Sequence, residues 1–159
     1  MIEASGSNGV LQRIRLHLAN KPTRTDDQEM HKDAKLALQV LMMPSHTNHE
    51  GTIFGGVILS NIDQAAYVEA RRHGPHRWVT AAVDRVDFLE PVYMGEIVSY
   101  WAWTSRQGTS SVTVNVDVLA QRRDTGKLCK VTTAELVMVA MGPDGKPRPH
   151  SGMAPEDAP

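Results

Sequence analysis

A single long helical stretch stands among strand-like segments, and this order is the feature that most restricts the fold. After the pair Gly55-Gly56, residues 57–72 contain neither proline nor glycine, which predicts one helix of about five turns. One strand-like segment precedes this helix, at 34–43, and the others follow it, at 78–89, 96–105, 110–122 and 128–141. The order predicts an α+β fold in which the helix covers one face of an antiparallel sheet.

The apolar positions agree with this assignment. Leu36–Met42 and Val112–Val118 place an apolar side chain at every second position, as expected for half-buried strands. One face of the helix is formed by Ile58, Ile62, Ala65, Ala66 and Glu69, and we expect Glu69 to mark the point where the helix leaves the core. The opposite edge carries Gly56, Ser60, Asp63 and Tyr67.

Charge and cysteine content exclude several classes of function. The 17 Lys and Arg residues nearly balance the 18 Asp and Glu residues, so no net field attracts nucleic acid or an anionic membrane. Cys129 is the single cysteine, which excludes an intrachain disulfide and favours a reducing, cytoplasmic setting. No apolar run approaches the ~20 residues that span a bilayer, and no secretory signal is expected at the N-terminus.

Polar segments flank the predicted domain on both sides. Residues 1–33 are polar with mixed charge and are predicted to form a flexible N-terminal tail. Residues 143–159 hold five of the nine prolines and are predicted to form a Pro-rich tail that neither extends a sheet nor packs a helix. The folded domain is therefore expected at 34–142.

The stretch from Met43 to Asp63, MPSHTNHEGTIFGGVILSNID, resembles the signature of hotdog-fold acyl-CoA thioesterases of the YciA-like type. Phe88–Val92, Gly95–Val98 and Gly108–Val112 follow in the family's order and spacing. The resemblance implies a hotdog fold, with a long central helix wrapped by a curved antiparallel sheet of about five strands. It also implies edge-to-edge homodimers, commonly assembled into hexamers as trimers of dimers.

The same resemblance implies an activity, the hydrolysis of a fatty acyl-CoA to free fatty acid and CoA. Asp63 matches the family's acidic residue and would be a general base toward water or a direct nucleophile, two roles that the sequence leaves open. Asn48 matches the family's asparagine, whose amide would orient the water or hold the thioester carbonyl, and which is also suited to an Asx turn. Gly56 lies at the helix start, where free N–H groups make it the candidate oxyanion donor.

The CoA moiety is expected to contact Gly55, Ser110 and Ser111, of which the two serines match the family segment along the pantetheine arm. Thr109 stands where many members of the family have a basic residue. The candidates for the missing phosphate contact are Arg106, Arg122 and Arg148.

Helix geometry adds a constraint that does not depend on the family. Gly56 and Asp63 are seven residues apart, which places them about 10 Å apart along one helix. An attacking carboxylate and an oxyanion donor must both lie ~3 Å from one reacting centre. We therefore expect a composite site, in which Asp63 of one subunit faces Gly56 and Asn48 of its partner.

Two other functions fit a hotdog domain, a non-catalytic acyl-CoA-binding regulatory module and a dehydratase acting on hydroxyacyl thioesters. The Asp/His pairing usual for the dehydratase is not matched, so we rank it last. The pairs His46/His49 and His73/His76 lack an obvious third ligand, and no metal or separate cofactor is expected.

Overall fold

A computed structural model describes residues 30–150 of the chain. The predictions made for the tail segments 1–29 and 151–159 lie outside the described residues. In chain order, the elements are β1 (Lys35–Leu41), η1 (Pro44–His46), α2 (Gly55–Ala70), η2 (Arg71–His73), β2 (Arg77–Phe88), β3 (Ile97–Gln107), β4 (Ser111–Gln121) and β5 (Leu128–Met141). Most predicted ends lie within one or two residues of these bounds.

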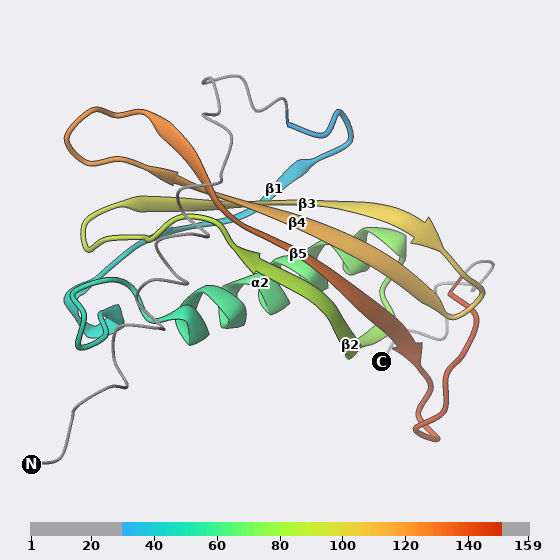
Figure 1. The fold of residues 1–159 in the computed structure, drawn as a ribbon. Coiled ribbons are helices and arrows are strands. Elements are labelled where there is room, and N and C mark those ends of the chain that lie inside the picture. The colour runs from blue at the N-terminus through green and yellow to red at the C-terminus, as the bar shows by residue number, and fades with distance from the viewer. Residues whose placement is uncertain (1–29, 151–159) are drawn as a thin grey trace, which may run out of the picture. The chain divides into compact units, whose positions relative to one another are not determined.

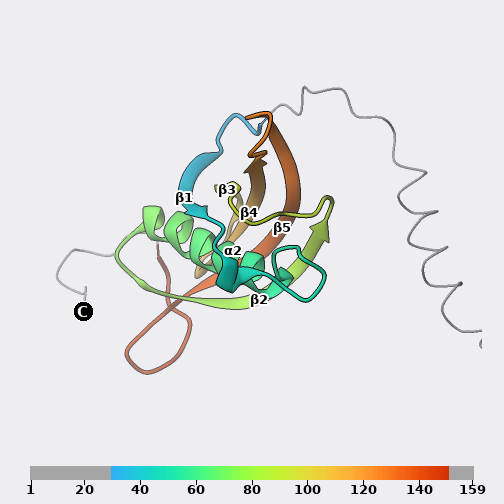
Figure 2. The same ribbon diagram turned by 90° about the vertical axis from the view of Figure 1, so that its left-hand side faces the viewer.

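The five strands form one antiparallel sheet in the order β1-β3-β4-β5-β2, which curves around α2 (Figures 1 and 2). This arrangement confirms the predicted α+β fold, in which a central helix is wrapped by a sheet. Because β2 lies at an edge, it pairs with β5 on one side and leaves its other backbone edge without a partner within residues 30–150. No helix in the same range has the length and apolar character needed to cross a bilayer.

The core lies between α2 and the concave face of the sheet. Ile58, Ile62, Ala65 and Ala66 of α2 are buried, as the helix pattern predicts. They face every second residue of β4, a set of fully buried side chains that comprises Val112, Val114, Val116, Val118 and Ala120. The small alanine side chains let the helix backbone approach the sheet closely, so this contact fixes which side of α2 faces outward.

The last turn of α2 differs from the prediction. Glu69 does not mark an exit from the core, because its side chain is only 6% exposed. Its carboxylate pairs with Arg72 and accepts a hydrogen bond from Thr104 Oγ1 at 3.1 Å. A charged residue is tolerated on the buried face because these donors replace the water that it loses.

His73 extends this polar chain toward the end of β3. Its Nε2 lies 2.7 Å from Thr104 Oγ1, and its Nδ1 lies 3.1 Å from Gln107 Nε2. Thr104 donates its hydroxyl proton to Glu69, so the consistent assignment is a neutral ring that donates from Nε2 and accepts at Nδ1. Burial lowers the pKa of His73, and the nearby Glu69 charge opposes that shift only in part, in agreement with a neutral ring.

The folded part of the chain continues beyond residue 142. Residues 143–150, assigned from the sequence to a Pro-rich tail, turn back onto the sheet. The Arg148 N–H donates to the Ala140 carbonyl at 2.9 Å, and the His150 N–H donates to the Thr109 carbonyl at 3.1 Å. The His150 side chain is 5% exposed, so this segment contributes a buried ring that a proline count does not reveal.

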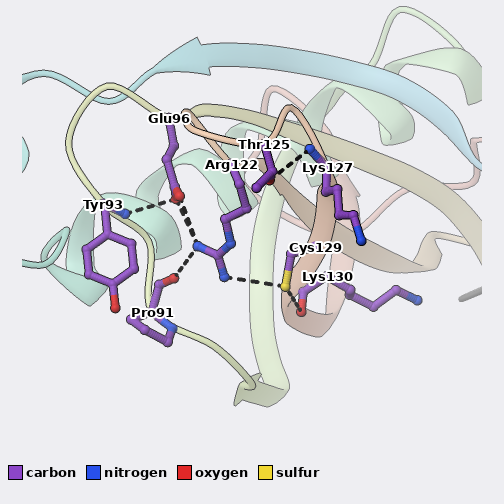
Figure 3. A network of polar contacts seen from close by, with 8 residues as sticks. All are labelled: Pro91, Tyr93, Glu96, Arg122, Thr125, Lys127, Cys129 and Lys130. Carbon is purple, nitrogen blue, oxygen red and sulfur yellow. Dashed lines mark hydrogen bonds and ion pairs between the residues drawn. The ribbon is translucent and has the colours of Figure 1, made fainter. Parts of the chain in front are cut away.

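A polar clamp joins β4 and β5 to the loop before β3 (Figure 3). Arg122 Nη1 donates to both Glu96 carboxylate oxygens, at 3.0 and 3.1 Å, and to the Pro91 carbonyl at 2.9 Å. Its Nη2 lies 3.4 Å from Cys129 Sγ. Glu96 also accepts the Tyr93 N–H at 3.0 Å, so the loop is fixed at several points.

Burial by itself lowers the pKa of Arg122, but hydrogen bonds and charge interactions with Glu96 and Cys129 outweigh it and raise the pKa above the ordinary value. The guanidinium is therefore engaged within the fold, which removes Arg122 from the candidates for a phosphate contact. The same loop accepts the Ile53 N–H at the Val92 carbonyl, 2.8 Å away. The clamp thus helps to hold the chain just before α2 begins.

Glu96→Gln should lower the free energy of unfolding by roughly 2 kcal/mol, because a half-buried guanidinium loses its counter-charge. The measurement is denaturant unfolding followed by circular dichroism. Arg123→Gln, which changes the neighbouring exposed arginine, should stay within about 0.5 kcal/mol of the native protein. Equal stability of the two variants would show that the clamp does not stabilise the fold.

Candidate active site

The start of α2 combines two glycines with two aromatic rings. A Cβ at Gly55 would lie 3.3 Å from Phe88 Cζ, and a Cβ at Gly56 would overlap the Phe54 ring. Close packing of the rings is therefore one reason for glycine at both positions.

The N-cap residue of α2, Phe54, provides no side-chain hydrogen bond to the first turn. The Val57 N–H donates to the Phe54 carbonyl at 2.9 Å, whereas the Gly56 N–H has no acceptor within residues 30–150. Free N–H groups and the positive end of the helix dipole favour a negatively charged oxygen here. This geometry is suited to the oxyanion role expected of Gly56.

Asn48 organises the loop that leads into α2. Its Oδ1 accepts the Glu50 and Thr52 N–H groups at 2.9 and 3.2 Å, an Asx-type turn of the kind weighed for this residue. Its Nδ2 donates to Thr52 Oγ1 at 2.9 Å. Since a side-chain amide carries two N–H donors, one remains for a substrate.

Asp63 lies on the exposed side of α2, away from the buried apolar face. Its Oδ1 accepts the Thr80 hydroxyl of β2 at 2.5 Å. Thr80 Oγ1 also lies 3.4 Å from Met138 Sδ in β5. The sheet edge therefore holds one carboxylate oxygen and leaves the other oxygen available for chemistry.

Two separate grooves flank the expected catalytic groups. One, of about 310 Å³, lies at the helix start and is lined by residues that include Gly55, Phe88 and Pro91. The other, of about 550 Å³, is lined by residues that include Asp63 and Thr80. The grooves share no lining residue, so one protomer does not bring the helix start and Asp63 into a common pocket.

The residues expected at the CoA arm lie on a different surface. Ser111 alternates with buried Val112 along β4, so its side chain faces the side of the sheet opposite α2. Arg106 crosses the same outer side, where its Nε lies 3.4 Å from Thr113 Oγ1. Ser110, in the turn before β4, accepts the Ala140 N–H at its carbonyl, 2.8 Å away. Within one protomer the sheet separates Ser111 and Arg106 from Asp63.

A metal centre is not formed by the described part of the chain. Across residues 30–150, no group of three or more His, Cys, Asp or Glu side chains is arranged to hold a metal ion. His76 and His150 instead make hydrogen bonds with backbone carbonyls, at 3.0 and 2.9 Å. These two rings are structural parts of the fold.

Comparison with known proteins gives consistent matches. A family model described as Thioesterase superfamily matches residues 50–127. The acyl-CoA thioester hydrolase YciA of Salmonella typhimurium is 37% identical over 118 residues, which cover 72% of this chain and 89% of that protein.

Solved structures agree with this result. A hexameric hotdog fold thioesterase of Campylobacter jejuni superposes with a TM-score of 0.70 at 40% identity, covering 75% of this chain and 92% of that one. The acyl-CoA hydrolase of Staphylococcus aureus, solved with butyryl coenzyme A and coenzyme A, gives a TM-score of 0.67 at 35% identity. In that case 74% of this chain and 71% of that chain are covered.

The helix wrapped by an antiparallel sheet, together with these matches, identifies the chain as a hotdog-fold thioesterase. More narrowly, the chain belongs to the YciA-like family of acyl-CoA thioester hydrolases. The family and the enzyme class expected from the sequence are thereby confirmed. A non-catalytic module is correspondingly disfavoured.

Thr80 is the site residue that sequence reasoning did not find. It lies 17 positions from Asp63 in an ordinary strand segment, and no local motif marks it. The one feature that could have identified Thr80 is its position in β2. The chain reverses direction between α2 and β2 through η2, so the first residues of β2 run back alongside the last turns of the helix. A threonine there can reach the helix only if the connection has the observed length.

Thr80→Val should lower kcat by ten-fold or more while KM changes little, because the variant keeps the shape and removes the donor to Asp63 (a hydrogen bond to a charged group contributes ~1.5–3 kcal/mol). Thr80→Ser should retain kcat within about three-fold, since it keeps the hydroxyl. Steady-state thiol release from an acyl-CoA measures both. Equal losses in the two variants would show that Thr80 acts through packing rather than by positioning the carboxylate.

Proposed function

We propose that this enzyme hydrolyses a fatty acyl-CoA to the free fatty acid and CoA, with Asp63 as the group that drives the attack. The observation that carries this proposal is the Asp63 carboxylate, held by Thr80 at the end of a largely apolar groove. A carboxylate beside apolar walls fits a thioester whose acyl chain is a hydrocarbon.

The chemistry follows from the free carboxylate oxygen of Asp63. In one route this oxygen takes a proton from water as that water adds to the thioester carbon. In the other it adds to the carbon itself and forms a mixed anhydride, which water then cleaves. In both routes the carbonyl oxygen becomes an oxyanion, the carbon–sulfur bond breaks, and the departing CoA thiolate is protonated.

The oxyanion is stabilised by the Gly56 N–H and by the free amide N–H of Asn48 from a second subunit. The reason is distance, because α2 separates Gly56 and Asp63 by about 10 Å along its axis. A symmetric dimer solves this for both subunits, because one interface places the Asp63 groove of each subunit against the helix start of the other. Each dimer then contains two equivalent sites. The lack of a shared groove within one protomer supports this arrangement.

Variants of a relative support the assignment of the two side chains. The Staphylococcus aureus hydrolase was solved with one asparagine changed to alanine and, separately, with one aspartate changed to alanine. These two positions lie fifteen residues apart in that chain, and Asn48 and Asp63 have the same separation here. We propose that Asn48 and Asp63 correspond to these two positions.

The assembly that we propose is a homodimer formed along β2 and built into a hexamer. The open backbone edge of β2 and the exposed Val83 and Phe88 on that strand provide the interface. Several structural relatives are described as hexameric thioesterases. Since the sheet separates Ser111 and Arg106 from Asp63 of their own protomer, we propose that these two residues and the neighbouring Ser110 contact CoA bound at a neighbouring subunit, whereas Gly55 contacts it at the helix start.

Asp63→Asn should lower kcat by roughly 10²–10⁴-fold, because the amide neither accepts the proton of water nor attacks the thioester. Asn48→Ala should lower kcat by roughly 10²-fold, because one oxyanion donor is lost. Thiol release from hexanoyl-CoA measures both, with circular dichroism confirming the fold. Asp124→Asn, an exposed change in the turn between β4 and β5, is the matched control and should retain native activity. Native turnover by Asp63→Asn would exclude the proposed mechanism.

A further inference from the structure

The groove at Asp63 has an apolar wall that the hydrolytic step itself does not use. Beyond Asp63 and Thr80, the groove is lined by Gln64, Tyr67 and Val68 from α2, by Trp78 and Val79 from β2, and by Met138 from β5. Val79 contributes its backbone, since its side chain alternates with those of Trp78 and Thr80. Tyr67 and Val68 are exposed in the protomer, so they add apolar area that a ligand can cover. An apolar ligand bound beside Asp63 would gain contact with the apolar part of this lining, formed by Tyr67, Val68, Trp78 and Met138.

The groove has a direction. The chain leaves α2 through η2 and returns in β2, so Thr80 lies opposite Asp63, while Val79 and Trp78 lie nearer to the last turns of the helix. Tyr67 follows Asp63 by four residues on the same side of α2, and Val68 lines the groove beside it. The groove therefore runs from the reacting carboxylate toward the end of α2.

Trp78 closes the far end. Its side chain is 4% exposed, and its Nε1 donates to the Gly74 carbonyl at 3.3 Å. The ring is packed against two buried imidazoles, with centroid distances of 5.8 Å to His76 and 5.3 Å to His150. Because the Trp78 ring is packed against both imidazoles, it cannot easily move aside to make room for a longer ligand.

The length of the groove can be expressed as the number of methylene groups that fit along it. Val68 lies five residues beyond Asp63, which is about 7.5 Å along the helix axis. An extended chain advances roughly 1.2 Å per bond, judged from the reach of the polypeptide backbone. The stretch from the carboxylate to Val68 and Trp78 therefore accommodates about six methylene groups.

From this geometry we infer that the groove binds the acyl chain of the substrate, with Val68 and Trp78 setting the length that it accommodates. The inference rests on the proposed function for the position of the thioester carbon beside Asp63. Methylene groups up to about the sixth enter the groove, and later ones remain outside it. Val68 and Trp78 are thus specificity-determining residues for acyl length.

The test is a series of saturated acyl-CoA substrates from acetyl to dodecanoyl, with kcat/KM measured for each. In the native enzyme kcat/KM should rise up to about four-fold per methylene for the first six and then level off. Val68→Trp should level off after about three methylenes. Trp78→Phe, which shortens the end wall, should extend the rise by one or two methylenes.

Leu128→Trp is the matched control, because Leu128 is 63% exposed at the start of β5 and does not line the groove. Its length series should be native. Identical length series for the native enzyme, Val68→Trp and Trp78→Phe would overturn the inference. So would a loss of activity in Val68→Trp that is equal at all lengths and accompanied by a change in the mass of the assembly, since a second copy would then occupy the groove.

Binding measurements separate this inference from the proposed function. The Kd of the same acyl-CoA series for the Asp63→Asn variant, measured by calorimetry, should tighten per methylene and level off at the same length. If the native protein hydrolyses none of the substrates, the proposed function fails, while the Kd series still decides what the groove binds. A Kd that does not depend on chain length would overturn the inference even if hydrolysis is observed.

Discussion

The packing of α2 against the concave face of the sheet is the interaction on which the rest of the structure depends. Ile58, Ile62, Ala65 and Ala66 are buried in this contact, so the helix has one orientation about its axis. Asp63 lies on the exposed flank of the helix as a direct consequence, since it follows buried Ile62 by one residue and is turned away from it by about 100°. The apolar core thereby determines where the Asp63 carboxylate stands.

The rigidity of the same helix is the reason for proposing a site shared by two subunits. A straight helix holds Gly56 and Asp63 at a fixed separation, and no rotation of side chains brings an N–H of the first turn to the carboxylate two turns later. Hydrolysis of a thioester requires both groups at one carbon. The free edge of β2 lies next to Asp63 through Thr80, so pairing of two edges would place two incomplete half-sites against each other.

The loops around the helix start show how remote parts of the chain support the site. Arg122 and Glu96 hold the loop that contains Val92, which in turn binds the backbone of Ile53 just before α2. Asn48 uses most of its side-chain hydrogen bonds to shape its own loop and retains one donor. A residue proposed for catalysis is therefore also part of the local fold, and this dual use limits which substitutions preserve both.

The elements of the fold were predictable because they depend on local periodicity, which is visible in any window of the chain. The signature that contains Asn48, Gly56 and Asp63 was recognisable because its residues form one continuous stretch of the sequence. Thr80 and His150 were not predictable, since each contacts a residue that is far away in the sequence and is brought near only by the fold. No local motif marks either position. Glu69 was misjudged because a pattern of polarity does not show that Thr104 and Arg72 will meet its charge.

The central claim is that each active site takes Asp63 from one subunit and Asn48 and Gly56 from another. The direct test is to co-express Asp63→Ala and Asn48→Ala subunits with different tags and to isolate the mixed assembly. In a hexamer that carries both tags, random pairing makes about half of the dimers mixed, and each mixed dimer regains one of its two sites, so about a quarter of native activity should return, whereas an isolated mixed dimer should show about half. If both groups came from the same chain, every site would carry a substitution, and activity no higher than that of the separate variants would contradict the account.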